Sequence, residues 1–254
     1  MIELWQLPVL FCAALAAGFV DAIAGGGGLI TLPALLGLGL DPRLALGTNK
    51  LQGTFGSASA TWHYAEAGTM KLRDCVRGFC LTFAGSVAGA LAVQQLDPSL
   101  LRKIMPVMLV SIAVFVWFKP KLGERDLHPR MSRAVFDVAA GLALGFYDGF
   151  FGPGTGTFWA IAFVLGLGFN LTRATGYTKV MNFASNIGSL AFFVYAGQVL
   201  WLAGFIMGIG QLIGARFGAR MVVARGTGFI RPVFLTVVLA ITAKLVYDAY
   251  FRRG

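Results

Sequence analysis

The sequence predicts an all-α integral membrane protein that crosses the bilayer several times, and three observations support this prediction. Hydrophobic residues make up 57% of the 254 residues and charged residues only 13%, against about 25% charged in an ordinary soluble domain. The mean hydropathy is +0.75. The charges are also segregated, because none lies between Lys179 and Arg216 or between Arg77 and Asp97. Uncharged runs of this kind suit the roughly 20 residues that a helix needs to cross the hydrocarbon core.

Ten apolar segments divide the chain, five in each half. The first half contains residues 4–23, 29–40, 45–67, 76–95 and 103–118, and the second contains 134–151, 156–170, 174–195, 200–220 and 231–250. The segments 29–40 and 156–170 are shorter than a spanning helix requires. We therefore expect a bundle of about eight full transmembrane helices and two short or broken ones, arranged as 5+5.

An internal repeat relates the two halves. Residues 18–28 read GFVDAIAGGGG and residues 145–155 read GFYDGFFGPGT, so Asp21 recurs as Asp148. A basic and polar stretch follows each motif, RLALGTNKLQGTFGS at 43–57 and RATGYTKVMNFASN at 173–186, in which Lys50 aligns with Lys179. Self-similarity on this scale predicts two related halves. They are residues 1–125 and 134–254, joined by a charged cytoplasmic linker at 126–133 within one membrane domain.

The basic residues predict how the halves are oriented. The net charge of +10 is concentrated in short connections, such as Lys71 to Arg77 and Lys119 to Arg133. This is the distribution of cytoplasmic loops beside anionic lipid rather than of a nucleic-acid surface. If all ten segments cross, the basic residues divide twelve to five between the two sides, but about ten to eight if the short segments do not cross. The positive-inside rule thus favours five crossings per half. An odd number of crossings makes the repeat inverted, as in many secondary transporters.

Two glycine-rich breaks indicate where a substrate would bind. Ala24 to Gly28 and Gly152 to Gly156 are poor helix formers, because each glycine costs up to about 1 kcal/mol against alanine. The backbone N–H groups that they free, together with the positive end of the following helix, can form an anion site. The alternative is that glycine allows helices to pack closely. We favour that alternative for Gly85 and Gly89 and for the glycines that the repeat matches to them, Gly210 and Gly214, with Gly218 one turn further on.

Polar side chains accompany each break. The candidate substrate-binding residues are Gly25, Gly26, Gly27, Gly28, Thr48, Asn49, Lys50, Gln52, Gly154, Thr155, Gly156, Lys179, Asn182 and Asn186. Lys50 and Lys179 either face the substrate, because ionisable groups inside a membrane usually serve a function, or extend to the surface. Asp21 and Asp148 are candidates for ion coupling, with pairing to a lysine and capping of the broken helix as the commoner structural uses.

Other chemistries find no support in the sequence. No cluster of His, Cys or carboxylates has the spacing of a metal site, and no Ser-His-Asp or GxSxG arrangement occurs. We therefore expect no enzyme, no cofactor, no metal and no nucleic acid as a partner. The expected partners are a small anionic substrate and membrane lipid, and the protein is either a monomer or a homodimer.

Several motifs resemble a known family. AGGGGLITLPALLGLGL, LALGTNKLQ and GFYDGFFGPGTGTF, followed by TKVMNFASN, are similar to the sulfite exporter TauE/SafE family, and most of all to its YfcA-like branch. The resemblance covers about residues 5–250. It implies a multi-pass permease of the bacterial inner membrane that exports sulfite or a small organosulfonate, driven by an ion gradient. A passive anion channel and a non-transport membrane assembly factor are the alternatives.

Overall fold

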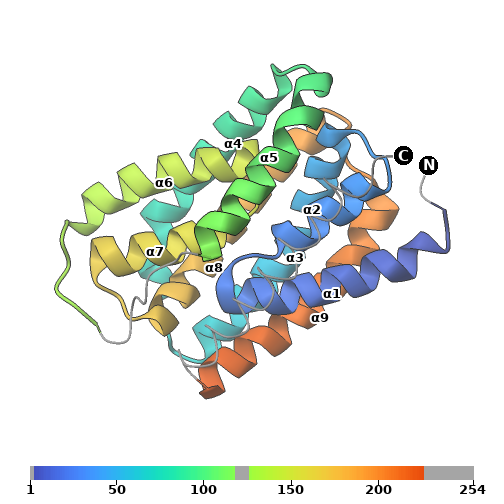
Figure 1. The fold of residues 1–254 in the computed structure, drawn as a ribbon. Helices are drawn as coiled ribbons and strands as arrows, with labels where there is room; N and C mark the ends of the chain where they lie inside the picture. Colours follow the sequence, from blue (N-terminus) through green and yellow to red (C-terminus); the bar gives the residue numbers. More distant parts are fainter. Residues whose placement is uncertain (1–2, 118–125, 226–254) are drawn as a thin grey trace.

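The computed structural model describes residues 3–117 and 126–225, and within these ranges the regular structure is helical, with no strand. The helices are α1 (Gln6–Ala24), α2 (Gly28–Gly37), α3 (Pro42–Glu66), the 3-10 helix η1 (Leu72–Cys75), α4 (Val76–Gln94), α5 (Pro98–Trp117), α6 (Arg133–Phe150), α7 (Thr155–Leu167), α8 (Leu171–Tyr195) and α9 (Trp201–Arg225). Figure 1 shows their arrangement. The all-α class is confirmed. Nine of the ten predicted segments coincide with these helices, and the tenth, 231–250, lies outside the described residues.

Several helices begin before the apolar run that predicted them. The carboxylate of Asp41 accepts a hydrogen bond from the Arg43 N–H at 3.0 Å, and Pro42 occupies the first helical position of α3. Asn170 caps α8 in the same way. Polar caps and an initial proline belong to the first turn of a helix but not to an apolar run. For these helices the segment read from hydropathy therefore begins about one turn late.

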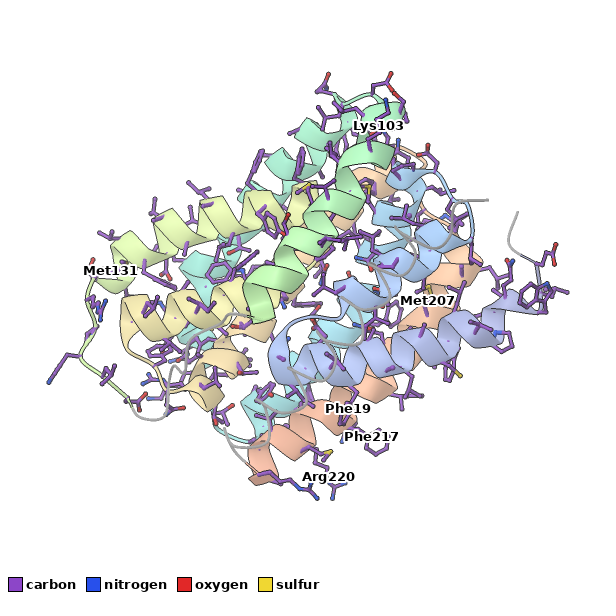
Figure 2. The ribbon with its side chains drawn as sticks, viewed as in Figure 1. Phe19, Lys103, Met131, Met207, Phe217 and Arg220 are labelled. Carbon is purple, nitrogen blue, oxygen red and sulfur yellow. The ribbon has the colours of Figure 1, made fainter. Side chains whose placement is uncertain are left out.

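Three helical stretches among the described residues are long and apolar enough to cross a membrane: Gln6–Ala24, Leu72–Gln94 and Trp201–Arg225. The helices α3 and α8 are 25 residues long but carry buried polar side chains, which lower their mean hydropathy. Large apolar side chains also face outward. Phe217 is 59% exposed and projects away from α9 in Figure 2. Long apolar helices with an apolar exterior indicate a membrane protein. The predicted short segments are the helices α2 and α7, of 10 and 13 residues.

Helices from opposite ends of the sequence lie side by side. Helix α1 packs along α9, and α4 packs along α6. Helix α3 packs against both α8 and α9, while α8 also packs against α4. Figure 1 shows α1 (dark blue) beside α9 (orange-red). The short helices α2 and α7 pack against the helices that flank them in sequence.

Glycines at these interfaces bring the helix backbones together, as predicted. A Cβ atom on Gly85 of α4 would lie 2.6 Å from the carbonyl oxygen of Leu142 on α6, and one on Gly214 of α9 would overlap the carbonyl oxygen of Leu15 on α1. Leu15 and Leu142 are 127 residues apart, like Asp21 and Asp148. Gly85 therefore corresponds to Gly214. The predicted match of Gly85 to Gly210 is wrong by one helical turn, because spacing alone cannot distinguish successive glycines four residues apart.

Substitution of one of these glycines should destabilise the bundle. In Gly89→Ala the new methyl group would overlap the carbonyl oxygen of Phe146, so α4 and α6 must separate. We expect a loss of about 1–3 kcal/mol, as for other overpacked cores, measured as denaturant unfolding in detergent. Gly37→Ala is the control, because nothing lies within 4 Å of its added Cβ. Equal stability of the two variants would contradict the packing role.

Candidate functional site

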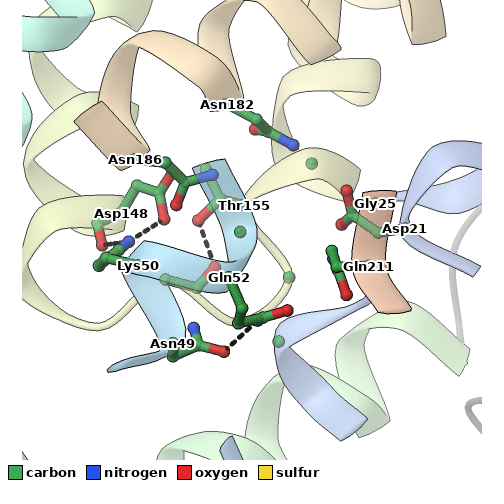
Figure 3. Close-up of a pocket in the computed structure, with 15 residues that line it drawn as sticks. Asp21, Gly25, Asn49, Lys50, Gln52, Asp148, Thr155, Asn182, Asn186 and Gln211 are labelled. Carbon is green, nitrogen blue, oxygen red and sulfur yellow. Dashed lines mark hydrogen bonds and ion pairs between the residues drawn. The ribbon is translucent and has the colours of Figure 1, made fainter. Parts of the chain in front are cut away.

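The two glycine-rich breaks meet inside the bundle. A Cβ atom on Gly25 would lie 2.5 Å from the Cα atom of Gly156, and one on Gly28 would lie 3.2 Å from the Cα atom of Pro153. Gly25 and Gly154 have φ angles of 78° and 82°, in the left-handed region that favours glycine. Gly25 is the C-cap that ends α1, and Gly154 is the N-cap that begins α7. The amino-terminal ends of α2 and α7 therefore converge at one place, which Figure 3 shows in close-up.

Two ion pairs with buried lysines flank this meeting point. The Nζ atom of Lys50 lies 2.6 Å from Oδ1 of Asp148, and the Nζ atom of Lys179 lies 3.0 Å from Oδ2 of Asp21. Each lysine also donates to the backbone carbonyl of the same aspartate. The lysine side chains are 1% and 0% exposed. Neither lysine extends to the surface, and pairing is the use that the structure gives to both aspartates.

The remaining carboxylate oxygens have local donors. Oδ1 of Asp21 accepts the backbone N–H of Gly27 at 3.2 Å, so Asp21 pairs with a lysine and also holds the glycine break before α2. Oδ2 of Asp148 accepts the hydroxyl of Ser185 on α8. Each carboxylate thus has a charged partner and a neutral one. Multiple donors are what a buried carboxylate requires in order to stay ionised.

A polar network that joins α2 to α3 faces the same region. The Thr31 hydroxyl donates to Oδ1 of Asn49 at 2.6 Å. The Gln52 amide donates to the Thr31 hydroxyl at 3.2 Å and to Oδ1 of Asn49 at 2.8 Å. Oε1 of Gln52 is buried and has no partner. In this orientation the network uses the amide nitrogen of Gln52 and leaves its oxygen unsatisfied.

These groups enclose a small cavity. Its volume for the centres of water-sized molecules is about 40 Å³, against about 10–15 Å³ for a single water. It therefore holds a few waters or one small ion. The lining residues are Asp21, Gly25, Gly28, Asn49, Lys50, Gln52, Gly53, Asp148, Gly152, Gly154, Thr155, Gly156, Asn182, Asn186 and Gln211. Figure 3 shows the Lys50–Asp148 pair on one side of the cavity and Asp21, Gly25 and Gln211 on the other.

Most of the predicted site residues line this cavity, but four do not. Thr48 is buried away from it, where its hydroxyl donates to the Leu44 carbonyl at 2.7 Å and accepts the Leu200 N–H at 3.0 Å. Gly26 and Gly27 lie in the break behind the lining, and Gly27 binds Asp21. Lys179 lines a smaller adjacent cavity that shares Gly25 and Gly156 with the first.

Sequence reasoning missed two lining residues, Gly53 and Gln211, and placed Gly152 in the second break without naming it among the binding residues. A Cβ atom on Gly152 would lie 2.9 Å from both Oδ1 of Asp148 and Nζ of Lys50, so this glycine makes room for the ion pair. Gln211 is the one carboxamide within α9. A lone amide on a helix otherwise made of apolar, glycine and arginine residues is the signal that could have identified it.

The electrostatics of the cavity suit a small anion. The two lysines and two aspartates balance in charge, and the amino-terminal ends of two helices add partial positive charge without a further side chain. Among the described residues, three amide oxygens that line the cavity lack a partner, those of Gln52, Asn182 and Gln211. A buried polar group left unsatisfied costs about 1–3 kcal/mol. An amide oxygen accepts hydrogen bonds, so each amide can bind water or a donor in this orientation, and an anion when its NH₂ is turned toward the cavity.

Comparison with known proteins identifies similar chains. The family Sulfite exporter TauE/SafE matches residues 10–245. "Probable membrane transporter protein YfcA" of Escherichia coli (strain K12) is 46% identical over 250 residues, which cover 98% of this chain and 93% of that protein. A "Probable membrane transporter protein" of Haemophilus influenzae is 46% identical over 242 residues, 95% of each chain. "Probable membrane transporter protein YunE" of Bacillus subtilis is 23% identical over 268 residues, 96% of this chain and 98% of that protein. No solved structure matches the chain.

Proposed function

Because the chain belongs to the TauE/SafE family of membrane transporters, we propose that it is a secondary transporter that exports a small anion, sulfite or an organosulfonate, across the bacterial inner membrane by alternating access. The observation that carries this proposal is the convergence of the α2 and α7 amino-terminal ends on a buried polar cavity. Broken helices whose amino-terminal ends face the substrate are a recurring design of secondary transporters.

The volume and the charges of the cavity favour a small anionic substrate. About 40 Å³ accommodates a compact anion of a few heavy atoms rather than a large organic acid. The ion-paired lysines and aspartates contribute no net charge, so the helix ends and side-chain amides would stabilise the anion. Such a site can release its substrate readily, because no unpaired cationic side chain lines the cavity among the described residues. Ready release suits a transporter.

An inverted repeat would provide the alternating access. Its support is that α1 packs on α9 as α6 packs on α4, with the glycine contacts at equivalent positions. In Figure 1 the chain also follows α1 and α6 in opposite directions. We propose that residues 1–125 and 134–254 form two inverted halves, with about eight full helices and two short ones, and a cytoplasmic linker at 126–133. Both ion pairs join one proposed half to the other, so rocking of the halves would strain them and protonation of Asp21 or Asp148 would release them.

Thermal unfolding of the purified protein tests the substrate. We expect sulfite or a small sulfonate at millimolar concentration to raise the melting temperature, because a ligand that binds the folded state stabilises it by mass action. Sulfate, thiosulfate and small carboxylates provide the comparison. Uptake into proteoliposomes under a pH gradient then tests transport. Stabilisation by none of the sulfur anions would overturn the substrate assignment, and uptake that responds to a membrane potential but ignores the pH gradient would favour a channel.

Substitution of Asn182 tests the site itself. Asn182 lines the cavity, is 6% exposed and has an unpaired amide oxygen. We expect Asn182→Ala to weaken sulfite binding about tenfold, the effect of losing one hydrogen bond to a charged group. Ser189→Ala is the matched control, because Ser189 is also buried on α8 but bonds only to backbone carbonyls of its own helix. Equal affinities of the two variants would show that the cavity is not the binding site.

A further inference from the structure

The two sides of the site differ in their side chains. Contacts made by glycines at equivalent positions of the repeat identify which residues differ. A Cβ atom on Gly145 of α6 would lie 2.5 Å from the carbonyl oxygen of Thr82 on α4. Gly18 of α1, which precedes Gly145 by 127 residues, makes the same close approach to the carbonyl oxygen of Gln211 on α9. Thr82 and Gln211 are therefore equivalent positions. They are 129 residues apart, which is the spacing of Lys50 and Lys179.

The same spacing makes Gln52 and Met181 equivalent positions. The pair Gln52 and Gln211 on one side of the site therefore corresponds to the pair Met181 and Thr82 on the other. On one side the Thr82 hydroxyl donates to Sδ of Met181 at 3.5 Å, and both residues are buried outside the cavity. On the other side both positions are glutamine and both glutamines line the cavity. Where one half has a Thr–Met contact buried outside the cavity, the equivalent positions thus carry two carboxamides that line the cavity.

The glutamine couple is held in place by its surroundings. A Cβ atom on Gly56, one turn beyond Gln52 on α3, would lie 3.0 Å from both Cδ and Nε2 of Gln211. Only glycine there lets the Gln211 side chain lie across α3 toward the cavity. Figure 3 shows Gln211 on the side of Asp21 and Gly25, opposite the Lys50–Asp148 pair. Gly56 thus lets Gln211 reach the cavity from α9, while Gln52 reaches it from α3.

Both glutamines have a buried amide oxygen without a partner. Gln52 and Gln211 are 1% and 3% exposed, and Oε1 of each is unsatisfied. Packing alone does not require this cost, since threonine and methionine fill the equivalent space on the other side without an unsatisfied group. A ligand or water that completes their hydrogen bonds would remove the penalty. Like Asn182, the two glutamines thus have hydrogen-bonding capacity that no described residue uses.

We propose that Gln52 and Gln211 form an oxyanion-binding pair, so that the substrate lies to one side of the site rather than midway between the two halves. This inference rests on the proposed transport of a small anion and names residues that determine its specificity. A carboxamide presents either its NH₂ donors or its oxygen acceptor, depending on its rotation. Gln52 can turn its NH₂ toward the cavity when Asn49 turns over with it, because Thr31 and Asn49 then donate to the Gln52 oxygen. The pair therefore binds the unprotonated oxygens of a sulfur oxyanion as well as the hydroxyl of its singly protonated form.

Binding measured by titration calorimetry tests the pair. Gln211→Met keeps a side chain of similar length but removes the amide, and we expect the affinity for methanesulfonate to fall about tenfold or more. Thr82→Val is the matched control, because it removes a hydroxyl at the equivalent position outside the cavity, and its affinity should stay within about twofold of wild type. Gln52→Met is a second test, since the other half already has methionine at this repeat position.

A pH profile separates contact with the ligand from a merely structural role. In Gln211→Glu an ionised carboxylate would repel the anion, whereas a protonated one would again donate a hydrogen bond. Binding of methanesulfonate, which stays a monoanion, should therefore be weak at about pH 8 and recover toward about pH 5. The pH profile of binding by the wild type is the control. It measures any effect of the charged groups of this region, which are Asp21, Asp148, Lys50 and Lys179.

The outcomes distinguish the pair from the function on which it rests. If the wild type binds no sulfur oxyanion, the proposed function fails and the pair fails with it. If the wild type binds but Gln211→Met and Gln52→Met, folded as judged by gel filtration, both bind within about twofold of it, the pair is overturned while the proposed function stands. Loss of affinity in both variants with Thr82→Val unaffected supports the pair.

Discussion

Replacing Lys50 by methionine is expected to destabilise the protein by about 3–5 kcal/mol and to abolish transport. The substitution leaves the Asp148 carboxylate, which is 4% exposed, without its charged partner at 2.6 Å. An isolated buried charge costs several kcal/mol, more than the packing of methionine can offset. Denaturant unfolding in detergent micelles would measure the stability, and sulfite transport in proteoliposomes the activity.

A double replacement separates stability from function. Lys50→Met combined with Asp148→Asn removes both charges, and it should recover much of the lost stability, because a buried pair can often be replaced by neutral groups. Transport should not recover, since the proposed cycle needs a pair that can break and reform. A single variant within about 1 kcal/mol of wild type would contradict the buried pair, and a double variant that transports normally would show that the pair is structural.

The helices were largely predictable from the sequence because a bilayer imposes a simple pattern. Runs of uncharged residues predicted α1, α4 and α9 closely, and their ends were set by basic loops and glycines. The errors lie at helix starts such as Pro42 and Pro98, where polar caps and prolines add a turn that hydropathy does not register. The order in which the helices pack did not follow from the pattern, since α1 lies along α9 at the far end of the described chain.

The residues of the site were predicted better than their partners. The repeated motif identified both lysines and both aspartates, but it left open whether each lysine faced a substrate, the surface or a carboxylate. The partner of Lys50 is 98 residues away and that of Lys179 is 158 residues away, so no local spacing could join them. Gln211 was missed for the same reason, because its helix reaches the cavity through packing against α1 and α3, which are distant in sequence.

Substitution of Gly25 by alanine is expected to abolish transport and to destabilise the protein by more than 2 kcal/mol, a figure of the order expected when backbone strain and overpacking combine. Gly25 has a φ angle of 78°, and an added Cβ atom would lie 2.5 Å from Gly156 Cα. The backbones of the two breaks would have to separate. The amino-terminal ends of α2 and α7 would then no longer converge on the cavity. Transport assays and thermal unfolding would measure the two effects.

Gly39→Ala isolates the strain from the contact. Gly39 has almost the same φ angle, 77°, but nothing lies within 4 Å of a Cβ atom added there. Both variants bear the cost of a left-handed alanine, roughly 1–2 kcal/mol, and only Gly25→Ala disturbs the meeting of the breaks. We therefore expect Gly39→Ala to be modestly less stable and to transport normally. If the two variants lose transport equally, backbone strain alone accounts for the defect, and the close approach of Gly25 to Gly156 has no part in function.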